Sequence, residues 1–341
     1  MKFRFNLQSL KSPYIKIILL LAISFLLSMI RPVLLYFGYS MADMPDAVHY
    51  ATMVESFRGN ANLFDVPPAW RIRILVPLLA SIIPVNAYIS LNIVSIIFNL
   101  LAVFFFHQFL SYFEISPKQQ FLGTLIYIFT APVIVLGFTP LTDSAGIFFI
   151  IISLYLYTIL IKESSRNNLK NYIIIGVTIG LGVLARETVI FVIPVLVLWK
   201  IIDEKIQWKS LVQFIIGIGL IPILIYLILV LIIGDISLGP ISLSRIIENF
   251  KDLFDERTLA TIAQLTFLLL IGIYGNYFPI VKKSKIIWKL ILGMACFLIP
   301  FIYAFLYLDM SFRFFWAFFI FAIPFFILSI DKLSSKIYQE K

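Results

Sequence analysis

The chain has 341 residues, of which 61% are hydrophobic and only 13% are charged, and its formal net charge is +9. A soluble domain of this length has too little interior to bury so much apolar surface, so the composition excludes an ordinary soluble fold. The positive charge does not call for nucleic acid as a partner, because basic cytoplasmic loops of a membrane protein account for it.

Apolar runs of about 20 residues, the length that crosses a bilayer core, recur along the whole chain. We therefore expect a single integral membrane domain, residues 1–341, folded as an all-α polytopic bundle of about ten spans, within a range of roughly eight to eleven. The expected spans are residues 14–37, 87–113, 120–138, 144–161, 172–185, 189–199, 211–233, 262–279, 286–308 and 314–330. The apolar run 74–83 is too short to cross and predicts an interfacial or re-entrant segment.

Two loops are long enough to hold structure of their own. The first covers residues 38–73, where Pro45 and Asp46 predict the start of a helix that runs to about Arg58 and stops at Gly59. On this helix Val48, Thr52 and Glu55 are expected to share one face, and Ala47, Tyr50, Ala51 and Val54 another. The second loop covers residues 234–261 and contains an amphipathic stretch at 243–254. Both loops are therefore expected to carry short helices at the membrane interface.

The distribution of basic residues predicts the orientation. With both termini in the cytoplasm, the inner segments carry 18 of the 27 basic residues, and 16 of these are lysines. The opposite orientation would place all 18 outside, against the positive-inside bias. We expect a multi-pass protein of the cell (inner) membrane whose two long loops face outward.

The remaining basic residues are nearly all arginines. They are Arg31, Arg58, Arg71, Arg73, Arg186, Arg245, Arg257 and Arg313, with Lys251 the exception. Topology alone does not require arginine there, and its planar guanidinium suits bidentate binding of a phosphate or carboxylate. The alternative is that these arginines pair structurally with acids on the same side; Arg186 and the adjacent Glu187 are one candidate pair.

Several short motifs follow one another along the chain. Asp46 precedes Tyr50 by four residues, and a Pro/aromatic/Arg segment at 67–80 leads into an apolar run. Leu-Thr-Asp-Ser at 141–144 opens a span, Leu-Ala-Arg-Glu-Thr at 184–188 precedes an apolar segment with a proline, and Asp309 precedes Arg313 by four residues. In this order the motifs resemble the GT-C superfamily of membrane glycosyltransferases, which use polyprenyl-phosphate sugars on the non-cytoplasmic side.

The resemblance implies roles for particular residues. Asp46 would be the catalytic base, with Asp43 as the second candidate, and the transfer would be an inverting one of hexosyl or mannosyl type. The set implied to bind substrate or lipid phosphate is Arg186, Arg313, Arg71, Arg73, Arg245, Tyr50, His49, Asp143 and Glu187. The implied partners are membrane lipids, the lipid-linked sugar donor and a glycan or lipid acceptor. The sequence holds no metal-ligand motif, so a divalent cofactor is left open and no metal ligand is assigned.

Three other functions fit a polytopic chain. A transporter or flippase of lipid-linked saccharides should show internal repeats and ionisable groups near the midplane, whereas here the charges lie at span ends. A glycan polymerase also has many spans and outer arginines but joins whole oligosaccharide units. A non-catalytic scaffold is the third alternative.

Overall fold

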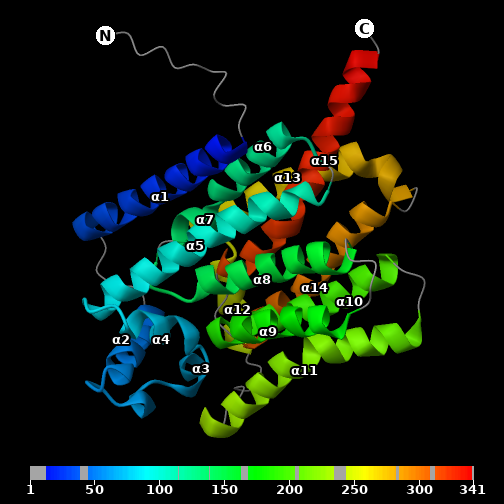
Figure 1. Cartoon of the computed structure of the whole chain (residues 1–341). Helices are drawn as coiled ribbons and strands as arrows, with labels where there is room; N and C mark the ends of the chain where they lie inside the picture. Colours follow the sequence, from blue (N-terminus) through cyan, green and yellow to red (C-terminus); the bar gives the residue numbers. More distant parts are fainter. Residues whose placement is uncertain are drawn as a thin grey trace.

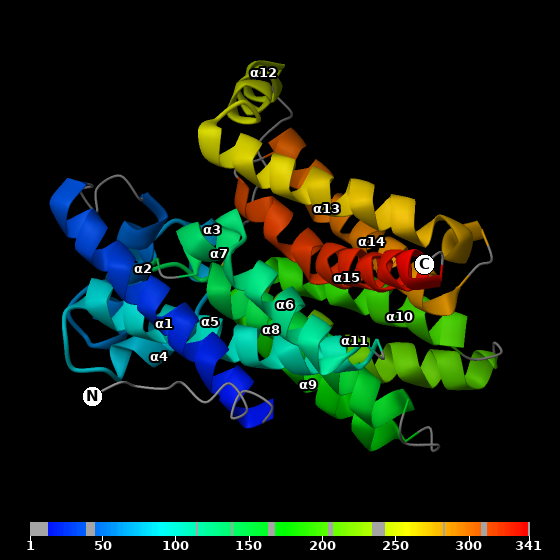
Figure 2. The ribbon, with the colours of Figure 1, turned by 90° about the horizontal axis from the view of Figure 1, so that it is seen from above.

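The computed structural model describes residues 13–38, 45–113, 115–137, 139–162, 168–203, 207–233, 243–281, 284–307 and 312–339. Within these ranges the chain forms helices α1 to α15 with short 3-10 and π turns, and no strand. The predicted all-α polytopic bundle is confirmed. Its long helices run side by side (Figure 1), and the same arrangement is seen from above in Figure 2.

The helices follow the predicted segments closely. The longer ones are α1 (Pro13–Gly38), α5 (Ala87–Ser111), α8 (Asp143–Tyr157), α9 (Leu169–Ala185), α10 (Val192–Asp203), α11 (Trp208–Ile233), α13 (Glu256–Val281), α14 (Lys285–Tyr307) and α15 (Trp316–Gln339). The shorter ones are α2 (Pro45–Phe57), α3 (Pro68–Arg71), α4 (Leu75–Ser81), α6 (Pro117–Ile128), α7 (Ala131–Leu136) and α12 (Leu243–Asp252). The turns are η3 (Leu63–Asp65), η5 (Glu187–Phe191) and η6 (Phe312–Phe315), which are 3-10, and η4 (Thr158–Lys162), which is a π turn.

Six helices in the described part of the chain are long and apolar enough to cross a membrane: α5, α8 with η4, α11, α13, α14 and α15 with part of η6. The chain is therefore a multi-pass membrane protein. The count of ten crossings stays a prediction. One expected span, residues 120–138, is divided into α6 and α7, because Pro132 lies in the first turn of α7 and lacks the N–H that a continuous helix would need.

The helices differ in how much of their surface lies inside the bundle. Buried residues make up 67% of the apolar window of α8 and 78% of that of α15, but only 28% for α11 and α13. Helix α8 packs against α5 and α9, α9 against α11, and α15 against α13 and α14. The two central helices are apolar on all sides, which is the pattern of a helix surrounded by other helices.

The first loop folds at one end of the long helices, where α2, α3 and α4 lie together (left in Figures 1 and 2). Helix α2 begins at Pro45 with Asp46 in its first turn. It ends at Phe57, and two residues later Gly59, with a φ of +83°, lets the Asn60 N–H donate back to the Glu55 carbonyl at 2.8 Å. The face that holds Ala47, Tyr50, Ala51 and Val54 is buried.

Arg58 fastens this loop to the bundle. Its guanidinium donates to the backbone carbonyls of Ser81 at 3.3 Å and Ile83 at 2.5 Å, and to the Ser90 hydroxyl at 3.0 Å. It also pairs with Glu55, at 2.8 Å. These carbonyls lie at the C-terminal end of α4, where the helix has acceptors without intrahelical partners. Arg58 therefore has the structural role that the sequence left as an alternative.

Two lysines expected in cytoplasmic loops are instead buried. Lys200 is 2% exposed and Lys289 is 1% exposed, although topology alone would leave both in water. The Lys289 Nζ pairs with Asp203 at 2.5 Å and donates to the Tyr112 hydroxyl at 2.5 Å. Lys289 also lies against the Trp199 ring, so this end of the bundle is closed by an ion pair among aromatic side chains.

Candidate active site

Both carboxylate oxygens of Asp46 are held. Oδ1 accepts a hydrogen bond from the indole Nε1 of Trp70 at 3.1 Å, and Oδ2 accepts one from Nη1 of Arg313 at 2.5 Å. Asp46 comes from the start of α2, Trp70 from α3 and Arg313 from η6. Arg313 lies 267 positions after Asp46 in the chain. The motif acid of the first loop and the late motif arginine are therefore direct partners.

A second arginine joins the first loop to the turn between α9 and η5. The guanidinium of Arg73 binds Glu187 through two parallel hydrogen bonds, Nε to Oε2 at 2.8 Å and Nη2 to Oε1 at 2.6 Å. Its Nη1 donates to the hydroxyl of buried Tyr50 at 2.8 Å. Such a bidentate pair fixes orientation as well as distance, so it sets the position of the loop over the bundle.

Arg186 pairs with Asp143, not with the adjacent Glu187. Arg186 ends α9 with an extended backbone, and Asp143 lies in the first turn of α8, where the helix dipole favours an acid. Their side chains are only 8% and 5% exposed. Gly146, one turn further along α8, makes room for the arginine: a Cβ there would lie 3.0 Å from that of Arg186.

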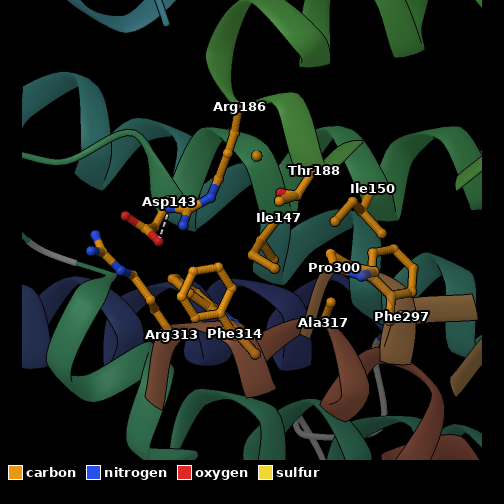
Figure 3. Close-up of a pocket in the computed structure, with 12 residues that line it drawn as sticks. Asp143, Ile147, Ile150, Arg186, Thr188, Phe297, Pro300, Arg313, Phe314 and Ala317 are labelled. Atoms are coloured by element: carbon orange, nitrogen blue, oxygen red, sulfur yellow. Dashed lines mark hydrogen bonds and ion pairs between the residues drawn. The ribbon is translucent and has the colours of Figure 1, made fainter. Parts of the chain in front are cut away.

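Arg186, Asp143 and Arg313 line one partly enclosed pocket with an empty volume of about 410 Å³ (Figure 3). These charged side chains gather on one side of it. The other side is apolar and is formed by α8, α14, η6 and α15 through Ile147, Ile150, Phe297, Pro300, Phe314 and Ala317. The pocket therefore has two arginines and one acid at one side and an apolar wall at the other.

The site contains three acid–arginine pairs: Asp46 with Arg313, Asp143 with Arg186, and Glu187 with Arg73. Burial by itself would raise the pKa of the Asp46 carboxyl, but Arg313, Arg73 and the Trp70 hydrogen bond outweigh it and lower that pKa.

The same competition acts on Glu187. Burial opposes its ionisation, yet Arg73 outweighs burial and lowers the pKa of Glu187 to about 2. Asp46 and Glu187 are therefore ionised at neutral pH.

The remaining candidates lie apart from these pairs or outside the described residues. The His49 ring packs on the Trp70 indole, with centroids 4.5 Å apart. Arg71 lies against Phe64 and does not line the pocket. Asp43 lies outside the described residues, as does the side chain of Arg245, although its backbone belongs to α12.

The sequence did not indicate the role of Trp70. Its place in the loop suggested an interfacial tryptophan, whereas its indole N–H is used by Asp46; an indole N–H that needs a partner was the only available signal. Thr188 and the apolar wall of the pocket were also missed, because their residue types are common in any span. In the ranges that the structure describes, no three His, Cys, Asp or Glu side chains gather in a group that could hold a metal ion.

Residues 65–233, about half of the chain, match the family described as dolichyl-phosphate-mannose-protein mannosyltransferase. The matched region contains Arg73, Asp143, Arg186 and Glu187, while Asp46 and Arg313 lie outside it on either side. No curated protein and no solved structure matches the chain. The matched family and the ordered motifs agree, and the chain belongs to the GT-C superfamily of membrane glycosyltransferases.

Proposed function

We propose that the chain transfers a hexose of the mannosyl type from a polyprenyl-phosphate donor to a lipid or glycan acceptor on the non-cytoplasmic face of the membrane. One observation carries the proposal: Arg313, which lines the pocket between α8, α14 and α15, directly holds the Asp46 carboxylate. A candidate base and a candidate phosphate site are thereby joined by a single side chain. The family match supports the reaction class.

The pocket supports a binding mode for the donor. Its phosphate would lie between Arg186 and Arg313, and the first isoprene units would run along Ile147, Phe297 and Pro300. Two guanidinium groups stabilise the charge that develops on the phosphate oxygen as the bond to the sugar breaks. The apolar wall gives the lipid a surface that resembles the membrane it leaves.

Asp46 would act as the general base in a single displacement. The acceptor hydroxyl attacks C1 of the sugar, its proton passes to the Asp46 carboxylate, and the C1–O bond breaks with its electron pair on the phosphate oxygen. The products are the glycosylated acceptor and polyprenyl phosphate, with the configuration at C1 inverted. The lowered pKa of Asp46 supports this role because it keeps the carboxyl in its proton-accepting form.

The resting contacts of Asp46 imply an order of events. Its Oδ2 is bonded to Arg313, so the arginine must turn partly toward the donor phosphate when the donor binds. Oδ2 then becomes accessible to the acceptor hydroxyl, while Trp70 keeps Oδ1 in place. The base would thus be exposed to a hydroxyl only when the leaving group is held.

The proposed orientation follows from the basic residues. The lysine-rich segments, the two termini among them, would face the cytoplasm, and the end with α2, α3 and α4 would face outward. Because polyprenyl-phosphate sugars have to reach that end from within the bilayer, a pocket with an apolar wall between α8, α14 and α15 supports the same placement.

The test compares Asp46→Asn with Asp65→Asn. Asp65 is an exposed acid of the same loop, and no hydrogen bond or ion pair from its side chain is seen among the described residues, so it is the matched control. With a short-chain polyprenyl-phosphate mannose as donor, Asp46→Asn should lower the rate of sugar release by about 10²- to 10⁴-fold, as expected for loss of a general base. Asp65→Asn should keep the wild-type rate.

Unchanged sugar release by a folded Asp46→Asn protein would remove the catalytic assignment. Release of glucose as fast as mannose from matched donors would remove the mannosyl assignment. If purified protein in liposomes moved the intact donor across the bilayer without any sugar release, the chain would be a flippase.

A further inference from the structure

Arg71 is buried and has no ionic partner among the residues that the structure describes. The residue is 9% exposed, and its Nε is fully buried without a hydrogen-bond partner in the described part of the chain. Its guanidinium makes no ion pair there and lies over the Phe64 ring, 5.2 Å from the ring centroid. An unpaired buried guanidinium is costly, so it normally belongs to a network or awaits a ligand.

The other arginines around the site contrast with Arg71. Arg58, Arg73, Arg186 and Arg313 each pair with an acid, respectively Glu55, Glu187, Asp143 and Asp46. The acid closest to Phe64 in the chain is Asp65, which is exposed and forms no ion pair with Arg71 in the ranges that the structure describes. The positive charge of Arg71 is therefore not neutralised by a direct partner there.

The contact with Phe64 leaves the guanidinium able to bind an anion. Stacking on a ring uses the face of the guanidinium and leaves its edge N–H groups for in-plane hydrogen bonds, the geometry that suits phosphate or carboxylate. Phe64 itself is 72% exposed although it lies in a structured turn, η3. An exposed aromatic ring beside such a cation is a surface on which a sugar ring can stack.

We propose that Arg71 and Phe64 form the acceptor subsite, which takes an acceptor glycan that carries a phosphate or carboxylate group. This inference rests on the proposed function. The donor phosphate has its own cations in Arg186 and Arg313, and Arg71 does not line their pocket. The subsite is nevertheless close to the base, because Arg71 follows Trp70 in α3 and Trp70 donates to Asp46. One acceptor molecule can therefore reach both.

The test measures binding of three alkyl glycosides to the full-length protein in phosphatidylcholine nanodiscs, below the critical micelle concentration of each. The probes are octyl glucoside, which is neutral, octyl glucuronide, which carries a carboxylate, and octyl glucoside 6-phosphate, which carries a phosphate. At least one anionic probe should bind about tenfold more tightly than octyl glucoside, as expected for a charge-assisted hydrogen bond. Arg71→Gln should remove that preference, and Arg71→Lys should keep part of it.

Phe64→Leu provides a variant whose folding is not in question, because the ring is mostly exposed. It should weaken binding of all three probes, whereas Phe267→Leu, in a membrane-spanning segment, should have no effect. Equal binding of the neutral and anionic probes by wild-type protein would overturn the proposal. So would a preference that survives Arg71→Gln, or a loss of polyprenyl-phosphate binding in Arg71→Gln without a change in glycoside preference.

Failure of this inference can be told apart from failure of the proposed function. Sugar release from the donor to water, without any glycoside present, depends on Asp46 and not on an acceptor. If Asp46→Asn leaves that release unchanged, the catalytic assignment is wrong whatever the glycosides show. If the release depends on Asp46 but no anionic preference exists, only the acceptor subsite is wrong.

Discussion

Replacing one partner of the Asp143–Arg186 pair should destabilise the protein far more than replacing both. The two side chains are 5% and 8% exposed, so a single removal leaves an almost fully buried charge without its counterion. Such removals cost about 3–5 kcal/mol, whereas replacing a buried pair by apolar residues of similar volume is close to neutral or stabilising. We expect Arg186→Met and Asp143→Leu each to lose about 3–5 kcal/mol, and the double variant to recover most of that loss.

The single cysteine of the chain provides the assay. Cys296 is 7% exposed in the folded protein, so a thiol-reactive dye should label it only after unfolding. The fraction of Cys296 that is labelled is measured as a function of temperature for wild type, the two single variants and the double variant. Because Asp143 lies at the start of α8 and Arg186 at the end of α9, the measured loss of stability reports how much the pair contributes to packing of α8 against α9 beside the pocket.

A second readout separates stability from function. Although the double variant regains stability, it lacks one of the two pocket cations, so its affinity for polyprenyl phosphate should be at least about tenfold weaker than that of wild type. The reasoning is refuted if the double variant is as unstable as the single variants. The donor site is wrong if the stable double variant binds polyprenyl phosphate as tightly as wild type.

Two further predictions concern the base and the helix packing. Arg313→Gln removes a cation that holds the pKa of Asp46 below its usual 3.8, and burial then raises that pKa. The acid limb of the pH profile of kcat/KM should therefore move to higher pH. An unmoved acid limb in the residual activity of this variant would exclude Asp46 as the titrating base. Gly176→Ala would place a Cβ 2.5 Å from the carbonyl oxygen of Gly217, so it should destabilise the α9–α11 contact by about 1–3 kcal/mol. The control is Gly219→Ala, whose Cβ would meet only a side-chain carbon at 3.8 Å, and it should have little effect in the same thermal labelling assay. Equal stabilities of the two alanine variants would contradict the close packing.

The sequence by itself determined the class of the protein and most of its helices. Apolar runs of bilayer length need no tertiary information, because each long helix satisfies its own backbone hydrogen bonds within the membrane. Local signals also placed α2, since Pro45 opens it and Gly59 alone permits the positive φ that closes it. The same locality allowed the ordered motifs to predict the superfamily.

The partners of the charged residues were decided only by the tertiary structure. Arg186 and Glu187 are adjacent in sequence and were a candidate pair, but the backbone at Arg186 is extended and the two side chains have different partners. Arg186 pairs with Asp143, 43 positions away, and Glu187 with Arg73, 114 positions away. A local pattern contains no information on contacts made through the packing of separate helices.

The burial of particular polar side chains likewise could not be predicted from the sequence. Lys289 and Arg71 look like solvated surface cations in a charge count, yet Lys289 closes an aromatic cluster and Arg71 lies beside Phe64 without an acidic partner in the described ranges. Whether such a cation is solvated depends on which elements cover it. The sequence thus predicted acids and arginines at one end of the bundle. The tertiary structure decided which of them neutralise one another, and that Arg71 has no such partner in the part of the chain that it describes, because burial and pairing depend on contacts between distant segments.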